Sequence, residues 1–475
     1  MAERLSEVLF NGGQDSNAKP KMASLRSNGL RLNNRPFRLN RTLLKKHKDY
    51  PFSYRFTSQM KILPTVKNRH TEMPSKQHHE CNSQMKVWLI QPAIAPYRVP
   101  LFQAIGSTPG IDLTVVVQAE TLAGHPWKID INQLPFQVLR VPAMRWQRNF
   151  ESEAFISPAI IREFLRHRPD VVICSGFTMS TMLLFLPMLL FGTPFIIWNE
   201  GTRSTDGNIS PIKLRIRRAL ARRASSFLVA GSLSRQYIEG LLPRPENGLY
   251  HLAYNCIDNA HFMRDMSNED DRVHLNQLKQ RFAPRNLLHV GKLGERKGVK
   301  QLLEAYRRLV HDGGMQDVGL ILLGDGPLRQ YICDFAEQHK LDKIHVGGFV
   351  SQDQIPVYYA LADVFVLLSI ADPNPLVIFE ALAAGLPIVC SSRAGNAVDF
   401  IVNGSNGYQV DPLDTDAVVD KMALALTTID RETSTRVSRE LVMKANYQDV
   451  AKVFADAVIF AGRTRGESLG SSVSW

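Results

Sequence analysis

Cysteine is scarce in this sequence, and the few that occur are scattered. The five are Cys81, Cys174, Cys256, Cys333 and Cys390, with no Cys-x-x-Cys motif and no histidine at zinc-site spacing. This pattern argues against a disulfide-stapled secreted domain. It favours a reducing, cytoplasmic location and predicts no metal site.

A secretory signal and an unbroken membrane span are also missing. The N-terminal segment contains no apolar run of the kind that signal peptides need. The most hydrophobic stretch, Thr181 to Trp198, is interrupted by Pro187, Gly192 and Pro194. Because such breaks disfavour a spanning helix, we expect a buried helix, a turn and a strand there.

Acidic residues are few in the N-terminal part of the chain. The net charge is +12, and residues 1–80 contain 16 Lys/Arg against 6 Asp/Glu, so the rest is nearly neutral. We expect residues 1–84 to be a disordered basic extension, or sequence upstream of a start near Met85. A solvated tail is favoured over membrane or nucleic-acid contact, and we predict no nucleic-acid partner.

From residue 85 onward, short apolar strands alternate with helical segments in two series. The strands are MKVWLI, IDLTVVVQ, PDVVICSG, PFIIWNE and FLVAGS, then NLLHVGK, VGLILLGDG, KIHVGGFV, DVFVLLS and PIVCSS. This alternation predicts an α/β fold with parallel sheets covered on both faces. The length allows two cores. We predict Rossmann-like domains at 85–265 and 286–445, and a helix at 446–462 that returns to the first domain.

The segment ADPNPLVIFEALAAG holds the most informative polar residues. Asn374 is a good N-cap and Pro375 suits a first helical turn, so the amides of Leu376 and Val377 would form an anion site. Glu380 lies in an otherwise apolar helix, where a carboxylate is costly unless it binds a polar ligand such as paired sugar hydroxyls. A glutamate at the solvent edge of the helix is an equally good interpretation.

A second segment, HVGKLGERKGVKQLL, places Gly291, Lys292 and Lys297 in a turn between a strand and a helix. Glycine permits close backbone approach, and two ammonium groups could neutralise a diphosphate. A solvated basic turn is the simpler alternative. LLGDGP and the glycine-rich loop from Gly348 to Val350 are weaker signals on their own.

Together and in this order, these segments resemble the C-terminal domain of glycosyltransferase family 4, the group 1 glycosyltransferases of the GT-B fold. The resemblance covers about residues 286–462 strongly and 85–261 more loosely. It implies a retaining, metal-independent, hexosyltransferase-type enzyme with no cofactor beyond its nucleoside diphosphate sugar donor. The acceptor would be a glycan or lipid-linked sugar, probed by the N-terminal domain, in cell-surface glycan or exopolysaccharide synthesis.

The resemblance also implies residue roles. Lys292 and Lys297 fall where the family places basic residues on the donor diphosphate, and Glu380 falls where a glutamate holds the ribose. Asp372 replaces the glutamate that touches the donor sugar, and Gly348 to Val350 lie near the base-binding loop. Two departures are the shorter Asp372 and the pair Asn374-Pro375 in place of Phe-Gly, which removes one backbone donor.

Three further features remain open. Glu200, at the end of a strand in IIWNEGTR, is our candidate polar group beside the reacting sugar, although a capping role is nearly as good. The basic helix at 212–225 could bind an anionic membrane surface, which would make the protein peripheral at the cytoplasmic face, but a solvated helix face is favoured. Asp414 and Asp416 match a metal-binding pattern, yet helix capping explains them better.

The chain is thus predicted to be a retaining glycosyltransferase. A GT-B epimerase acting on sugar nucleotides and a non-catalytic sugar-nucleotide-binding protein are the alternatives.

Overall fold

The computed structural model describes residues 84–122, 129–149, 152–207, 209–244 and 249–470. Nearly all of the predicted extension, 1–84, lies outside the described residues. Within them, no helix has both the length and the apolarity required to cross a membrane.

A parallel seven-stranded sheet organises the first domain in the part of the chain that is described, with order β3-β2-β1-β6-β7-β8-β9. Its strands are β1 (Met85–Gln91), β2 (Ile111–Val117), β3 (Gln137–Arg140), β6 (Val171–Ser175), β7 (Phe195–Asn199), β8 (Ser226–Val229) and β9 (Tyr250–Leu252). An antiparallel hairpin, β4 (Met144–Asn149) and β5 (Ser152–Ile156), is added between β3 and the next helix.

Alternation along β1 explains why this sheet is covered on both faces. Val87 and Leu89 enter one core, and Trp88 and Ile90 enter the other. The first core also holds α2 (Val99–Gly106) and α17 (Tyr447–Gly470). The second core holds α3 (Ala159–His167), α4 (Met179–Leu190), α6 (Pro211–Ala221) and α7 (Ser232–Glu239). The short helix α5 (Arg203–Asp206) precedes α6.

A second parallel sheet, six-stranded within the described residues, has the order β12-β11-β10-β13-β14-β15. The strands are β10 (Arg285–Val290), β11 (Val318–Leu323), β12 (Ile344–Gly348), β13 (Val364–Leu367), β14 (Ile388–Ser391) and β15 (Gly407–Val410). The chain runs outward from β10 in one direction and from β13 in the other. The neighbours β10 and β13 therefore form the topological switch point, where open α/β sheets bind ligands.

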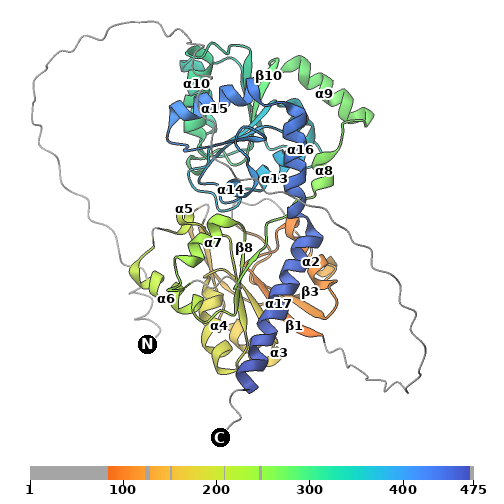
Figure 1. Ribbon diagram of the computed structural model, residues 1–475, viewed down its shortest axis with the longest axis vertical. Helices are drawn as coiled ribbons and strands as arrows, with labels where there is room; N and C mark the ends of the chain where they lie inside the picture. The colour runs from red at the N-terminus through yellow and green to blue at the C-terminus, as the bar shows by residue number, and fades with distance from the viewer. Residues whose placement is uncertain (1–83, 123–128, 150–151, 208, 245–248, 471–475) are drawn as a thin grey trace, which may run out of the picture. The chain divides into compact units, whose positions relative to one another are not determined.

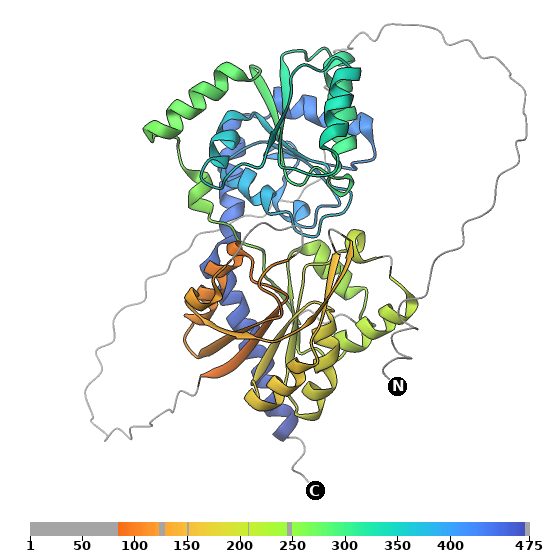
Figure 2. The ribbon, with the colours of Figure 1, turned by 180° about the vertical axis from the view of Figure 1, so that it is seen from behind.

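Helices cover both faces of this sheet as well (Figures 1 and 2). One face carries α10 (Val299–His311), α11 (Arg329–Gln338) and α15 (Thr415–Thr428). The other carries α8 (Asn259–Met263), α9 (Glu269–Arg281), α12 (Ile355–Leu361), α13 (Leu376–Ala383), α14 (Ala397–Phe400) and α16 (Arg431–Val442). The segment between the two predicted domains, 266–285, is largely α9, whose Leu278 is buried in this core.

The last helix, α17, follows the second domain in the chain but packs on the first (Figure 1). Its contacts are with α2, β6, β7, β8 and β9. Val450, Phe454 and Val458 are buried in the first core, whereas Ile459 is 41% exposed.

The segment from Thr181 to Trp198 is most of α4, a turn and β7, as predicted. The expected burial of the helix is wrong for one of its faces, because Leu186 and Leu190 are 62% and 71% exposed. The interpretation of Asp414 and Asp416 fares better. Asp414 caps α15 by accepting a hydrogen bond from the amide of Ala417 at 3.0 Å, and Asp416 pairs with Arg308.

Candidate active site

The loops that follow β10 and β13 meet at the carboxyl ends of these neighbouring strands. The amide of Ile370 donates to the carbonyl of Arg296 at 2.8 Å, and the Arg296 Nε donates to the carbonyl of Ala371 at 3.1 Å. Two segments that lie about 75 residues apart in the chain therefore form one surface.

Glycine is required where these loops touch. Gly298, at the start of α10, has φ +70°, and a Cβ there would lie 1.8 Å from the carbonyl oxygen of Leu368. No other residue combines that conformation with that contact. The glycine thereby holds the turn of Lys297 against the end of β13.

An ion pair joins the two loops. Lys297 Nζ lies 2.5 Å from Asp372 Oδ2, with the carboxylate side chain 8% exposed and the lysine 24% exposed. The hydroxyl of Ser369 lies 3.5 Å from the same oxygen. Lys292 occupies the start of the same β10–α10 loop and also has a partner. The sequence prediction placed Lys297 on a diphosphate and Asp372 on a sugar, but it did not anticipate that they pair with each other.

A buried histidine lies beside this pair and was missed from the sequence. His289 is fully buried in β10, and its Nδ1 lies 3.1 Å from the carbonyl oxygen of Val366, whereas its Nε2 has no partner. Burial lowers the pKa of His289 to about 4, so the ring is neutral. Nε2 faces the space next to Gly291, where a Cβ would meet both Nε2 and the Cε of Lys297 at 3.9 Å.

The start of α13 lies directly after the Asp372 segment. The helix begins at Leu376, and its first amides, those of Leu376 and Val377, have no intrahelical acceptor. The prediction that Asn374 caps this helix is wrong, because the cap position is occupied by Pro375 and no side chain caps the helix. Asn374 lies one residue too early. Its side chain is buried, and neither its oxygen nor its nitrogen has a partner.

Glu380 lies one turn into α13 and contacts Tyr359 of α12. The Tyr359 hydroxyl donates to Glu380 Oε2 at 2.8 Å. Burial raises the pKa of Glu380 to about 7, and the hydrogen bond from Tyr359 opposes this rise. The carboxyl is thus close to its midpoint at neutral pH. Tyr359 was also missed, because it occurs in an apolar helix segment that gives no sign of a polar role.

The loop after β12 joins the same edge of the sheet. Gly348 has φ +70°, and its carbonyl accepts from the amide of Gly324 at 2.7 Å. A Cβ on Gly324 would in turn lie 1.9 Å from the carbonyl oxygen of Gly291. The loops that contain Gly291, Gly324 and Gly348 therefore lie in direct contact at these glycines. Next to Gly348, Phe349 is 78% exposed, and Val350 packs on the core.

Glu200 is held at the end of β7 in the first domain. Its Oε1 lies 2.5 Å from Arg98 Nη2, and Arg98 also donates to Gln91 Oε1 at 2.5 Å. The guanidinium lies 4.5 Å from the centre of the Trp198 ring. Arg98 thus fixes the Glu200 carboxylate from one side.

A cavity of about 340 Å³ brings Glu200 next to the Asp372 segment. Its lining includes Glu200, Ser204 and Asp206 from the first domain, and Arg296, Ala371 and Pro373 from the second. The hydroxyl of Ser204 donates to the carbonyl of Arg393 at 3.2 Å. The two sheets therefore contribute their carboxyl-end loops to a shared space.

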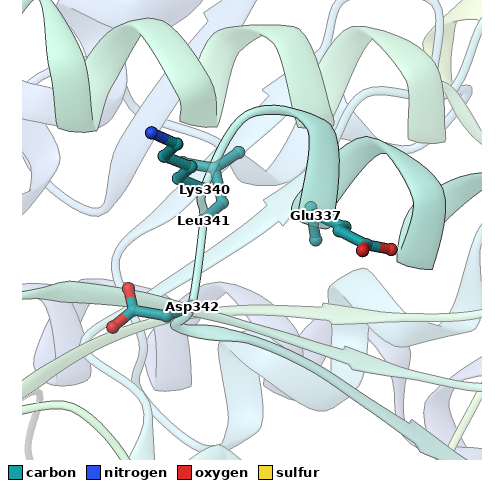
Figure 3. Close-up of a pocket in the computed structure, with 5 residues that line it drawn as sticks. Glu337, Lys340, Leu341 and Asp342 are labelled. Carbon is teal, nitrogen blue, oxygen red and sulfur yellow. The ribbon is translucent and has the colours of Figure 1, made fainter.

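A larger depression of about 570 Å³ lies elsewhere, where α11 ends and β12 begins. It is at the amino end of its strand, whereas Lys297 and Asp372 follow the carboxyl ends of theirs. Figure 3 shows that the charged groups of Glu337, Lys340 and Asp342 point in different directions. They do not converge on a ligand, so we assign the site to the switch point.

Two family models match the chain. The model described as "Glycosyl transferases group 1" matches residues 272–440, and that of a "Glycosyl transferase 4-like domain" matches residues 104–250. The first match contains the β10 and β13 loops, and the second contains Glu200.

Curated relatives are glycosyltransferases of several kinds. An alpha-D-kanosaminyltransferase of Streptomyces kanamyceticus is 24% identical over 259 residues, which are 52% of this chain and 65% of that protein. An N-acetyl-alpha-D-glucosaminyl L-malate synthase of Bacillus anthracis is 30% identical over 175 residues, 36% of this chain and 42% of that protein. The chain spans about half the length of the curated relatives it matches.

Solved structures agree on the fold. The HepE protein of Anabaena, crystallised with UDP, aligns with a TM-score of 0.60 and 17% identity over 79% of this chain and 100% of that one. Sucrose-phosphate synthase from Thermosynechococcus elongatus aligns with a TM-score of 0.60 and 16% identity over 82% of this chain and 100% of that one. With two Rossmann-like domains, two matching family models and these neighbours, the chain belongs to the group 1 glycosyltransferases and has the GT-B fold.

Proposed function

We propose that this protein transfers a sugar from a nucleoside diphosphate sugar to an acceptor hydroxyl, with retention at the anomeric carbon. The donor and the acceptor are the two substrates, and the reaction uses neither a metal nor another cofactor. The observation that carries the proposal is the meeting of Lys297, Asp372 and the start of α13 at the switch point between β10 and β13. The HepE neighbour, which was crystallised with UDP-glucose, supports this donor class.

The chemical role of this arrangement is to stabilise the departing nucleoside diphosphate. Lys292, Lys297 and the amides of Leu376 and Val377 supply positive charge where negative charge develops on the diphosphate. Asp372 pairs with Lys297 in the structure. When the donor binds, Lys297 would pair with the diphosphate in place of Asp372. The Asp372 carboxylate could then accept hydrogen bonds from hydroxyls of the donor sugar.

The remaining contacts orient the nucleoside. The Glu380 carboxylate accepts the two ribose hydroxyls, with Tyr359 holding one of its oxygens. The base lies against the backbone from Gly348 to Val350, where glycine leaves room for a flat ring. The buried side-chain amide of Asn374 has no partner in the protein, and it would form hydrogen bonds with the donor sugar.

Glu200 lies on the acceptor side of the reacting sugar, and Arg98 fixes its position. The acceptor hydroxyl attacks from the face that the diphosphate leaves, in a cavity that both domains line. We take the acceptor to be a glycan or a lipid-linked sugar of cell-surface polysaccharide synthesis, presented at the cytoplasmic face of an anionic membrane.

Donor binding and transfer test the proposal directly. Binding of UDP-, GDP-, ADP- and TDP-sugars is measured by calorimetry for the wild type, Lys297→Ala and Lys300→Ala. Lys300 is the matched control because it pairs with Glu295 on the outside of the same loop. We expect one donor class to bind, at least tenfold weaker binding in Lys297→Ala, and wild-type affinity in Lys300→Ala.

The stereochemistry of the product, read by proton NMR of the anomeric signal, tests retention. An inverted product would refute the retaining mechanism. A folded protein that binds no donor would refute the donor site itself.

A further inference from the structure

We propose that the outer surface of α3, α4 and α6 docks on an anionic lipid bilayer through an apolar patch bordered by cations. This inference extends the proposed function by naming the surface that would meet the membrane. The test measures membrane binding and not catalysis. The membrane-docking proposal and the proposed glycosyl transfer can therefore be refuted independently of each other.

Helix α4 has two apolar faces, only one of which is needed for the core. Leu184 and Met188 are fully buried against the sheet. Leu186 and Leu190 point outward and are 62% and 71% exposed. Their four-residue spacing places them on one side of the helix, one turn apart.

Neighbouring side chains extend this outward surface into a patch. Leu189 is 42% exposed, Phe191 at the end of α4 is 42% exposed, and Leu165 on the adjoining α3 is 41% exposed. We call Leu165, Leu186, Leu189, Leu190 and Phe191 the apolar patch. Large apolar side chains that are exposed together on neighbouring helices mark a surface of contact with a protein or a membrane.

Cations border the apolar patch on both sides. Arg162 and Arg166 on α3 and Arg168 directly after it are exposed, and Arg162 pairs with Glu163 at 3.0 Å. The Arg168 guanidinium lies 3.6 Å from the centre of the Phe191 ring. On α6, the exposed cations have no carboxylate partner among the described residues. They are Lys213, Arg215 and Arg218 on the helix and Arg222 and Arg223 directly after it, which we call the basic row.

The three helices form one surface because of the sheet topology. Helix α4 joins β6 to β7 and α6 joins β7 to β8, which are successive parallel strands, so both lie on the same face together with α3. Figure 1 shows them in the order α6, α4, α3. Glu200 follows the carboxyl end of β7, whereas the apolar patch lies at its amino end, so docking leaves the shared cavity open.

Charge selects the occupant. A second copy would bring the basic row and the α3 arginines against the same cations, and residues 1–80 are themselves basic, with 16 Lys/Arg against 6 Asp/Glu. Both would be repelled. An anionic bilayer offers negative headgroups to the cations and acyl chains to the apolar patch.

Vesicle co-sedimentation of the full chain tests this assignment. The probes are phosphatidylcholine vesicles with and without about 30% phosphatidylglycerol, at low and high salt. We expect binding to anionic vesicles only, with part of it surviving high salt, because apolar insertion is not screened. Leu186→Ser/Leu190→Ser should lose the salt-resistant part. Arg218→Glu/Arg222→Glu should weaken low-salt binding at least tenfold.

Matched controls lie on α9 of the second domain. Val273→Ser removes an apolar side chain of 46% exposure, and Lys279→Glu reverses an exposed cation. Both should bind vesicles as the wild type does. Circular dichroism and nucleotide thermal shifts confirm that all variants are folded.

Three outcomes would overturn the proposal. Unchanged binding in both double variants would assign the membrane contact to residues 1–83. Equal binding to neutral vesicles would remove the role of charge. Concentration-dependent dimerisation that is lost in Leu186→Ser/Leu190→Ser, in sedimentation velocity without lipid, would make the apolar patch a contact between copies.

Discussion

A carboxyl group with a pKa near 7 changes its charge within the physiological range, and Glu380 is such a group. Only the carboxylate can accept both ribose hydroxyls, so protonation should weaken donor binding. We predict that the Kd of the preferred nucleoside diphosphate rises as the pH falls from about 8 to 6. Tyr359→Phe should move the midpoint to higher pH, because the lost hydroxyl lowers the pKa of Glu380.

Calorimetry across this pH range measures the effect. Glu380→Gln is the control, since an amide does not titrate. It should bind more weakly at high pH and show a much flatter profile. Identical profiles for Glu380→Gln and the wild type would assign the pH dependence to another group.

Gly298 allows a second prediction at the residue scale. Its Cβ would meet the carbonyl of Leu368, whereas Gly314 has nearly the same φ, +68°, and open space around it. Gly314→Ala should cost about 1 kcal/mol from the left-handed backbone alone. Gly298→Ala should cost roughly 3 kcal/mol or more, because the β13 end must also move. Denaturant unfolding of both variants gives the difference, and equal losses would mean that the contact at Leu368 relaxes freely.

At the scale of the element, the start of α13 can be tested without disturbing the helix. Proline is tolerated at the first helical position but lacks an amide hydrogen. Leu376→Pro therefore removes one proposed phosphate donor, and Leu376→Ala loses a similar side chain but keeps the amide. A hydrogen bond to a charged group contributes about 1.5–3 kcal/mol, so we expect roughly tenfold to hundredfold weaker nucleotide binding in Leu376→Pro than in Leu376→Ala. Equal affinity would remove these amides from the site.

Strands could be predicted from the sequence where one pattern, a continuous apolar run, is enough to identify them. The apolar runs predicted β10, β11, β13 and β14, because strands buried on both faces need no polar alternation. Strand β3 (QVLR) and the β4–β5 hairpin are partly exposed and contain polar residues, so their pairing depends on neighbours that the local sequence does not reveal.

In the candidate site, individual residues could be predicted from the sequence, but the contacts between them could not. Residue types and spacing pointed to Lys297 and Glu380, and the family resemblance pointed to Asp372. The pairing of Lys297 with Asp372, the hydrogen bond of Tyr359 and the buried ring of His289 all depend on contacts between distant segments. The cap at Asn374 failed because Pro375 shifts the helix start by one residue, a difference within the usual uncertainty of helix ends.

For the whole molecule, α17 makes the first domain depend on the end of the chain. Deleting residues 446–475 removes Val450, Phe454 and Val458 from the first core. Burial of three such side chains contributes roughly 5–9 kcal/mol, which is comparable to the entire stability of a domain. We predict that the truncated chain loses one of two thermal transitions and binds a hydrophobic dye.

The second domain should remain folded in this truncated chain, because its two cores contain no residue of α17. Deletion of residues 471–475 alone is the control and should leave both transitions unchanged. A truncated chain with both transitions intact would show that α17 is dispensable for the first core.

Helix α17 also determines the order in which a newly made chain can mature. The ribosome completes the second domain while one side of the first sheet is still bare, since the helix that covers it is synthesised last. The usual sequence of co-translational folding, amino-terminal half first, is thereby reversed. The earlier half is left as an unfinished intermediate, and a chain that is terminated just before Tyr447 leaves that half, rather than the later one, as the target of quality control.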